Sequence, residues 1–145
     1  MNFEDFQKRL EEGKHLQDIL GFTPSMMAEF YEAASRLFEK QMYSESADAF
    51  VFLSTLNPRI DSYWIGLGMS EQMNNNYNDA LIAYSMAILL NGRNPLPHYH
   101  SAACYYGLKD DVNTRVCLEM ALEFAEEGSE IHAQASQAAK RLNYN

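Results

Sequence analysis

Apolar residues recur along this chain at intervals of three and four, which is the spacing of amphipathic α-helices. The first such segment, residues 2–12, places Phe3, Phe6 and Leu10 on one face among charged residues, and one further helical turn is expected before Gly21. The same spacing predicts longer helices at residues 25–40 and 44–56, 61–73 and 77–91, 96–108 and 111–126, and 130–142. Thr23-Pro24 has the pattern of an N-cap followed by proline at the first helical position.

Residues of similar size and character also recur every 34 positions. Matched columns hold a ring, a small residue that lets two helices approach, a second small or hydroxyl residue, and a large apolar residue. In sequence order they are Phe30, Trp64 and His98; Ala34, Gly68 and Ala102; Ser46, Ala80 and Thr114; and Phe50, Tyr84 and Leu118. Thirty-four residues is the period of the tetratricopeptide repeat, a helix–turn–helix unit that buries its apolar face only when stacked on a neighbour.

The sequence therefore predicts an all-α fold with three tetratricopeptide repeats in a right-handed superhelix, an N-terminal helix and a C-terminal capping helix. Residues 1–22 are expected to form a helical arm, and residues 23–145 the repeat domain with its cap. The apolar face of Phe3, Phe6 and Leu10 predicts that the N-terminal helix either self-associates, as a weak homodimer, or packs on the first repeat.

In this repeat the first helix of each hairpin lines a concave groove, and its inner residues follow helical spacing. On the 34-residue register these positions are Tyr31, Ser35 and Phe38; Ile65, Met69 and Gln72; and Tyr99, Ala103 and Tyr106. Most of them are aromatic or apolar and none is charged, which suits an extended apolar peptide bound with little salt dependence. The alternative is that several of these side chains are core between repeats.

Composition narrows the function further. The net charge is −9, which disfavours a nucleic-acid binder. The N-terminus lacks a secretory signal and no segment has the length of a membrane span, so we expect a cytosolic protein without stable membrane insertion. Two cysteines, Cys104 and Cys117, are too few for a disulfide framework and are expected to be reduced and buried.

Motifs for catalysis are missing from the sequence, and we expect neither an enzyme nor a cofactor. His98, His100 and Cys104 invite a metal interpretation, but only His100 and Cys104 share a helical face. Zinc needs four ligands, or three and a water, so no metal site is predicted.

Several segments follow a pattern more specific than the repeat columns. They are residues 21–24 with 30–34, 43–50, 63–68, 76–80, 83–87 and 94–105. Through these segments the chain resembles the class II chaperones of bacterial type III secretion, the SycD/LcrH/IpgC-like proteins, over about residues 14–126. The most specific parts are Trp64-Ile65-Gly66-Leu67-Gly68 and Pro95-Leu96-Pro97-His98.

The resemblance implies a cytosolic chaperone that holds an extended, proline-containing segment near the N-terminus of hydrophobic translocator proteins. It assigns peptide binding to the groove positions and self-association to the N-terminal helix, although the arm of this chain is short. A structural repeat adaptor that joins subunits of a larger assembly is the alternative function.

Overall fold

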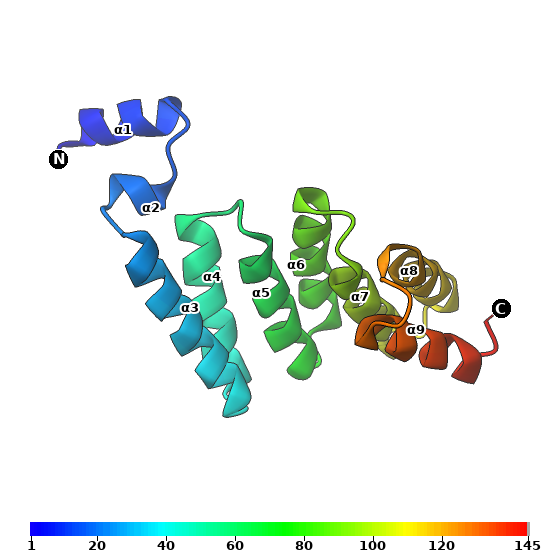
Figure 1. Ribbon diagram of the computed structural model, residues 1–145. Helices are drawn as coiled ribbons and strands as arrows, with labels where there is room; N and C mark the ends of the chain where they lie inside the picture. The colour runs from blue at the N-terminus through cyan, green and yellow to red at the C-terminus, as the bar shows by residue number, and fades with distance from the viewer. Residues whose placement is uncertain (145) are drawn as a thin grey trace.

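The computed structural model describes residues 1–144, and within them the chain forms nine α-helices and no strand. Figure 1 shows the helices following one another in a row from the N-terminus to the C-terminus. They are α1 (Phe3–Glu11), α2 (Leu16–Ile19), α3 (Pro24–Glu39), α4 (Tyr43–Leu56), α5 (Asp61–Met73), α6 (Tyr77–Leu90), α7 (Pro95–Gly107), α8 (Asp111–Phe124) and α9 (Glu130–Arg141). Each predicted helix is present, with ends within two residues of the prediction at most positions.

Three hairpins, α3–α4, α5–α6 and α7–α8, stack in chain order, and α9 packs on α8 and α7. The first helices of successive hairpins contact one another, α3 with α5 and α5 with α7. Within residues 1–144 the second helices, α4, α6 and α8, make no such contact among themselves. The stack is therefore curved with its first helices on the inner side, as the repeat pattern predicts.

Local sequence explains the helix ends. The Thr23 hydroxyl accepts a hydrogen bond from the Met26 backbone amide at 3.2 Å, and Pro24 begins α3. The turn inside each hairpin has one residue in the left-handed region: Gln41, Asn75 and Lys109, with φ of 61°, 60° and 60°. These three residues are 34 positions apart, so the period governs the turns as well as the helices.

The columns of the repeat are packing contacts. The Ser46 hydroxyl donates to the Ala34 carbonyl oxygen at 3.1 Å and joins α4 to α3. A Cβ atom added to Gly68 would overlap the ring of Tyr84, so the glycine is what allows α5 and α6 to approach at this point. The predicted C-terminal cap is confirmed, since Ala135 and Ala139 of α9 form one buried cluster with Ala102, Leu118 and Ala121.

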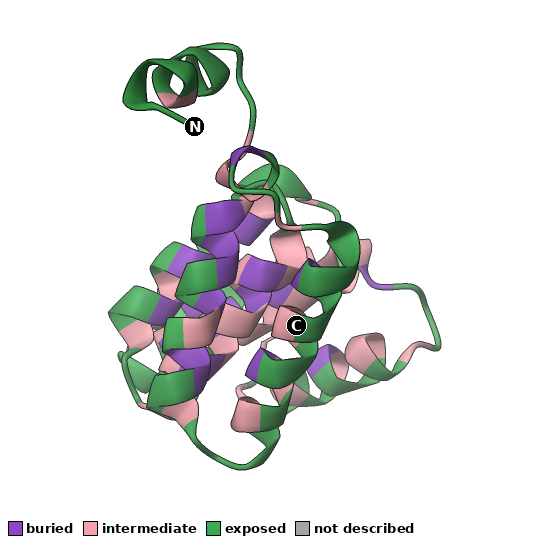
Figure 2. Cartoon of the chain, turned by 90° about the vertical axis from the view of Figure 1, so that its left-hand side faces the viewer, coloured by how far each residue is buried: buried purple, intermediate pink, exposed green. Residues whose placement is uncertain are grey.

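The N-terminal helix stands apart from the stack. Among the described residues α1 contacts only α2, and Figure 2 shows it projecting from the body with no buried residue. Phe3 is 71% exposed and Leu10 is 43% exposed. Packing of α1 on the first repeat was one of the two predicted arrangements, and it is wrong because α1 contacts only α2, whereas α2 contacts α4 and packs Leu16 against the first core cluster.

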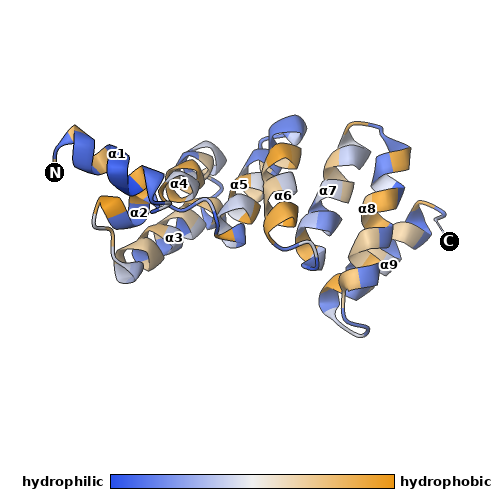
Figure 3. Ribbon diagram, turned by 90° about the horizontal axis from the view of Figure 1, so that it is seen from above, coloured by the Kyte–Doolittle hydropathy of each residue, from blue (hydrophilic) through white to orange (hydrophobic). Residues whose placement is uncertain are grey.

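The middle second helix, α6, is apolar around most of its circumference. Figure 3 shows hydrophobic residues on several sides of it. Ala80, Ala83, Tyr84 and Ala87 are buried, whereas Ile82 and Leu89, on the outer side of the stack, are 64% and 79% exposed. Apolar surface is thus not confined to the inner side of the stack.

Candidate functional site

The first helices carry two open cavities, each of about 390 Å³. We call one the α3–α5 cavity; it is lined by Tyr31, Ser35, Phe38, Glu39, Phe50, Asp61, Ser62, Ile65, Gly66, Met69, Asn94 and Leu96. We call the other the α7–α9 cavity; it is lined by Tyr99, Ala102, Ala103, Tyr106, Thr114, Leu118, Ala138, Arg141 and Leu142. Both are mainly apolar concavities of the kind that takes side chains of a bound peptide.

Eight of the nine predicted groove residues line these cavities. Tyr31, Ser35, Phe38, Ile65 and Met69 surround the α3–α5 cavity, and Tyr99, Ala103 and Tyr106 the α7–α9 cavity. Gln72 lines neither cavity, because its Oε1 accepts a hydrogen bond from the Tyr84 hydroxyl at 2.7 Å. That bond satisfies the polar end of an otherwise buried tyrosine, so Gln72 supports the fold between the cavities.

Tyr31 belongs both to the α3–α5 cavity and to the core beside it. Its ring packs edge-on against Phe50 at 5.8 Å between centroids and lies 5.9 Å from the ring of Tyr63. Burial, and then the neighbouring Tyr31, raise the pKa of the Tyr63 hydroxyl. Tyr31 therefore lines the cavity and packs in the core at the same time.

A glycine on α5 makes room for one of the rings that line the α3–α5 cavity. A Cβ atom at Gly66 would overlap the Phe50 ring, so Gly66 lets that ring reach across from α4 to the base of the cavity. Phe38, at the other end of α3, packs edge-on against Tyr43 at 5.3 Å. The aromatic part of the lining thus comes from the first hairpin, α3–α4, and α5 faces it with Ile65, Gly66 and Met69.

The cavities also carry charge, which corrects the expectation of an uncharged groove. Glu39 and Asp61 line the α3–α5 cavity, and Arg141 lines the α7–α9 cavity. Glu39 ends α3, Asp61 begins α5 and Arg141 ends α9, so none of them lies at a mid-helix inner position. The 34-residue register predicts groove residues only at mid-helix inner positions, so it does not predict these three residues.

Three titratable side chains, Tyr84, His100 and Cys104, lie in the interior of the stack and line neither cavity. The His100 ring stacks on the ring of Tyr84 at 5.7 Å between centroids, and burial lowers the pKa of His100 to about 4. Burial raises the pKa of the Cys104 thiol to about 12 and that of the Tyr84 hydroxyl as well. At neutral pH these groups are uncharged, which suits packing and gives no thiolate nucleophile.

His98 is held by the fold. Its Nε2 atom lies 2.9 Å from the carbonyl oxygen of Gly92, and its ring stacks on Phe124 at 5.6 Å. No group of three His, Cys, Asp or Glu residues within residues 1–144 is placed to hold a metal ion. In the same residues, no helix is both long and apolar enough to cross a membrane.

No family model matches the chain. Among solved structures, it is similar to a type III secretion complex from Aeromonas hydrophila, with 17% identity over 97% of this chain and 95% of that one and a TM-score of 0.88. It is similar to the secretion chaperone SycD of Yersinia enterocolitica, in complex with a peptide of the translocator YopD. That match has 19% identity over 83% of this chain and 92% of that one, with a TM-score of 0.78.

A third similar structure is PcrH, from Pseudomonas aeruginosa, in complex with the chaperone binding region of PopD. It has 21% identity over 85% of this chain and 95% of that one, with a TM-score of 0.81. These likenesses establish that the chain has the all-helical repeat fold of the translocator chaperones.

Proposed function

We propose that this protein is a cytosolic, non-enzymatic chaperone of a type III secretion system. Its client is a hydrophobic translocator protein, of which it holds an extended, proline-containing segment near the N-terminus. The observation that carries the proposal is the α3–α5 cavity, where Tyr31, Phe38 and Met69 offer a concave apolar surface to solvent on the inner side of the stack.

The shape and chemistry of this cavity support an extended peptide rather than a folded surface. A strand-like segment presents alternate side chains, and an open cavity of about 390 Å³ has room for such a side chain. Aromatic rings and a methionine contribute contact area and can adapt to side chains of different shape. SycD and PcrH hold translocator segments on the same fold, which supports the same class of client here.

The organisation of the chain fits this role. We propose that residues 1–22 form an arm that self-associates weakly, and that residues 23–145 form the client-binding domain, whose last residue lies outside the described part of the chain. Phe3, Phe6 and Leu10 would form the contact of the arm, because α1 leaves them without a partner element in the stack.

Co-purification from the native host tests the proposal. The tagged full-length protein is compared with Ser35→Trp, which fills the α3–α5 cavity, and with Ala33→Trp, an exposed position of the same helix that lines neither cavity. Mass spectrometry should identify a protein with long apolar segments bound to the parent and to Ala33→Trp. Ser35→Trp should weaken its binding by about 1–3 kcal/mol, the range of anchors at peptide interfaces.

The outcome also decides against the alternative function. An adaptor that joins folded subunits would retain its partner in Ser35→Trp, since a folded surface does not enter this cavity. Partners that are soluble assembly subunits, captured equally by all three proteins, would overturn the chaperone proposal. Circular dichroism of each variant establishes that the helices are intact.

A further inference from the structure

We infer that the α7–α9 cavity is a second anchoring subsite for the same extended client segment. That segment would carry a basic residue beside its first apolar anchor and an acidic residue beside its second. The inference rests on the proposed function, because it assumes that an extended client occupies the inner side of the stack.

The two cavities are built from the same positions of the repeat. Tyr31, Ser35 and Phe38 line the first cavity, and the residues 68 positions later, Tyr99, Ala103 and Tyr106, line the second. Matching positions of a repeat face the same side of the stack, so both cavities open on the inner side. One extended segment can therefore run across both.

The spacing of the helices sets the spacing of the anchors. Packed helices lie about 8–10 Å apart, and α3, α5, α7 and α9 contact one another in sequence. The first cavity lies between α3 and α5 and the second between α7 and α9, which places them two such steps, about 16–20 Å, apart. At about 3.3 Å per residue, the two anchors would be about five or six residues apart in an extended segment.

The second cavity is suited to an apolar side chain. Ala102, Thr114 and Leu118 line it and are each at most 3% exposed, and Tyr99 and Tyr106 add two rings to the lining. Its volume of about 390 Å³ equals that of the first cavity. An apolar anchor entering it would cover parts of the buried cluster that joins α7, α8 and α9.

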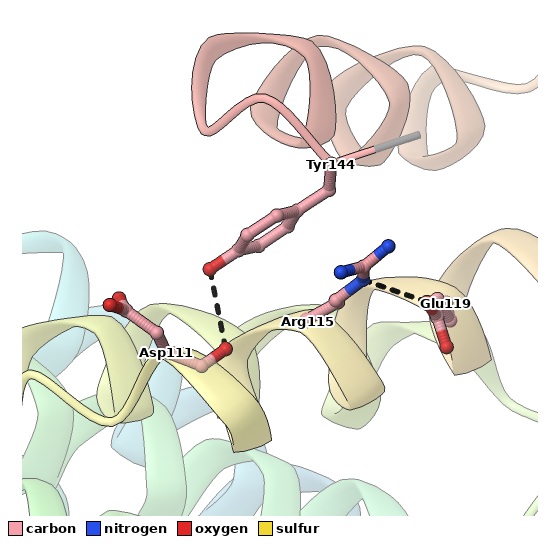
Figure 4. Close-up of polar contacts among 4 residues, drawn as sticks. All are labelled: Asp111, Arg115, Glu119 and Tyr144. Atoms are coloured by element: carbon pink, nitrogen blue, oxygen red, sulfur yellow. Dashed lines mark hydrogen bonds and ion pairs between the residues drawn. The ribbon is translucent and has the colours of Figure 1, made fainter.

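The described end of the chain leaves this cavity open. Figure 4 shows Tyr144 reaching from beyond α9 to α8, where its hydroxyl donates to the Asp111 carbonyl oxygen at 3.3 Å. The Arg115 guanidinium lies over the same ring, 5.5 Å from its centroid. Tyr144 is thus fixed on α8 and does not line the cavity.

Opposite charges at the two cavities give the client a direction. Glu39 and Asp61 favour a basic neighbour to the first anchor, and Arg141 favours an acidic neighbour to the second. The protein has a net charge of −9, so a cation beside one cavity is a local departure from its overall field. A segment bound in the opposite direction would place its basic residue beside Arg141 and its acidic residue beside Glu39 and Asp61.

A display library of random twelve-residue peptides, selected on the full-length protein, tests the inference. Enriched peptides should share two apolar positions about five or six residues apart, with a basic residue near one and an acidic residue near the other. Selection on Arg141→Glu should replace the acidic preference by a basic one, while Lys140→Glu, at an exposed neighbour that lines neither cavity, should leave it unchanged.

Binding of one enriched peptide, measured by fluorescence polarisation, then separates the subsites. Ala103→Trp should fill the second cavity and weaken the two-anchor peptide at least tenfold, whereas a peptide shortened to its first anchor should bind as it does to the parent. Exchanging the acidic residue of the peptide for lysine should restore binding to Arg141→Glu. Ala33→Trp is the matched control.

Enrichment of a single apolar anchor without a second position or charge preference would overturn this inference and leave the proposed function standing. Enrichment of no apolar motif would count against both. A shift in mass of Ala103→Trp by light scattering, without peptide, would assign the α7–α9 cavity to a second copy of the chain and also overturn the inference.

Discussion

Trp64 and His98 make the same hydrogen bond one repeat apart. The indole Nε1 of Trp64 donates to the Pro58 carbonyl oxygen at 2.8 Å, and Nε2 of His98 lies 2.9 Å from the carbonyl oxygen of Gly92. His98 lies 34 residues after Trp64, and Gly92 lies 34 residues after Pro58, so the two bonds are one repeat period apart. A carbonyl oxygen only accepts, so His98 carries a proton on Nε2, and the histidine replaces the tryptophan as a donor that fixes the start of a first helix.

His98→Phe should therefore destabilise the protein by about 1 kcal/mol, the usual net contribution of one such hydrogen bond. The ring of phenylalanine keeps the stacking on Phe124, so the loss of stability measures the contribution of the hydrogen bond that His98 donates to Gly92. Urea unfolding followed by circular dichroism measures the difference, with His132→Phe on α9 as the control. Equal stability of His98→Phe and the parent would show that the bond to Gly92 contributes nothing.

Gly68→Ala should destabilise the fold by about 1–3 kcal/mol or more. The added methyl group would overlap the Tyr84 ring, which is fully buried and bonded to Gln72, so it cannot move aside. Gly92→Ala is the control, since its Cβ would meet only the Ile88 carbonyl oxygen at 3.4 Å. Similar melting temperatures for the two variants would remove Gly68 from the packing contacts that hold α5 to α6.

Stability should fall as the pH falls from about 6.5 to about 4, because of His100. Burial lowers its pKa in the folded state to about 4, from the ordinary value of 6.5, so between these values the unfolded chain binds more protons. The loss of stability reaches about 3 kcal/mol at the lower end of the window, at about 1.36 kcal/mol for each unit of pKa. Above pH 6.5 His100 is neutral in the folded and the unfolded state, so no stability is lost there.

Urea unfolding of the parent and of His100→Gln at pH 7 and pH 5 isolates this effect. Carboxylates titrate in both proteins, so the difference between their pH dependences belongs to His100. The parent should lose about 2 kcal/mol more than His100→Gln over this interval. Parallel losses in the two proteins would contradict a buried, neutral His100.

Deletion of residues 1–12 should convert a weak dimer into a monomer. Phe3 and Leu10 are exposed on a helix that contacts only α2, and association would remove that apolar surface from water. Light scattering over a range of concentrations measures the mass of the deletion and of Phe3→Ser/Leu10→Ser. A parent that is monomeric throughout, or a deletion that remains dimeric, would exclude the arm from self-association.

Much of this fold depends on interactions between residues that are close in the sequence, and it could therefore be predicted from the sequence. Helix ends followed from caps such as Thr23. The pairing of a small residue on the first helix with a large one on the second recurs in the clusters of Ala34 with Phe50 and of Ala102 with Leu118, and in the contact of Gly68 with Tyr84. The all-helical fold, the hairpins and the cap were predicted for this reason. Eight of nine inner positions line cavities because helical spacing decides which side of a helix a residue faces.

What the sequence left open depended on side-chain directions and on contacts between distant segments. Gln72 has the spacing of a groove residue. Its side chain instead accepts a hydrogen bond from the Tyr84 hydroxyl, whose ring is buried. Glu39, Asp61 and Arg141 reach the cavities from helix ends, where periodicity is uninformative. The sequence by itself determined the repeats and the inner face; only the tertiary structure decided which charges border that face, and that α1 lies off the first repeat. The physical reason is that helical period fixes direction within one helix, whereas these features depend on how separate helices meet.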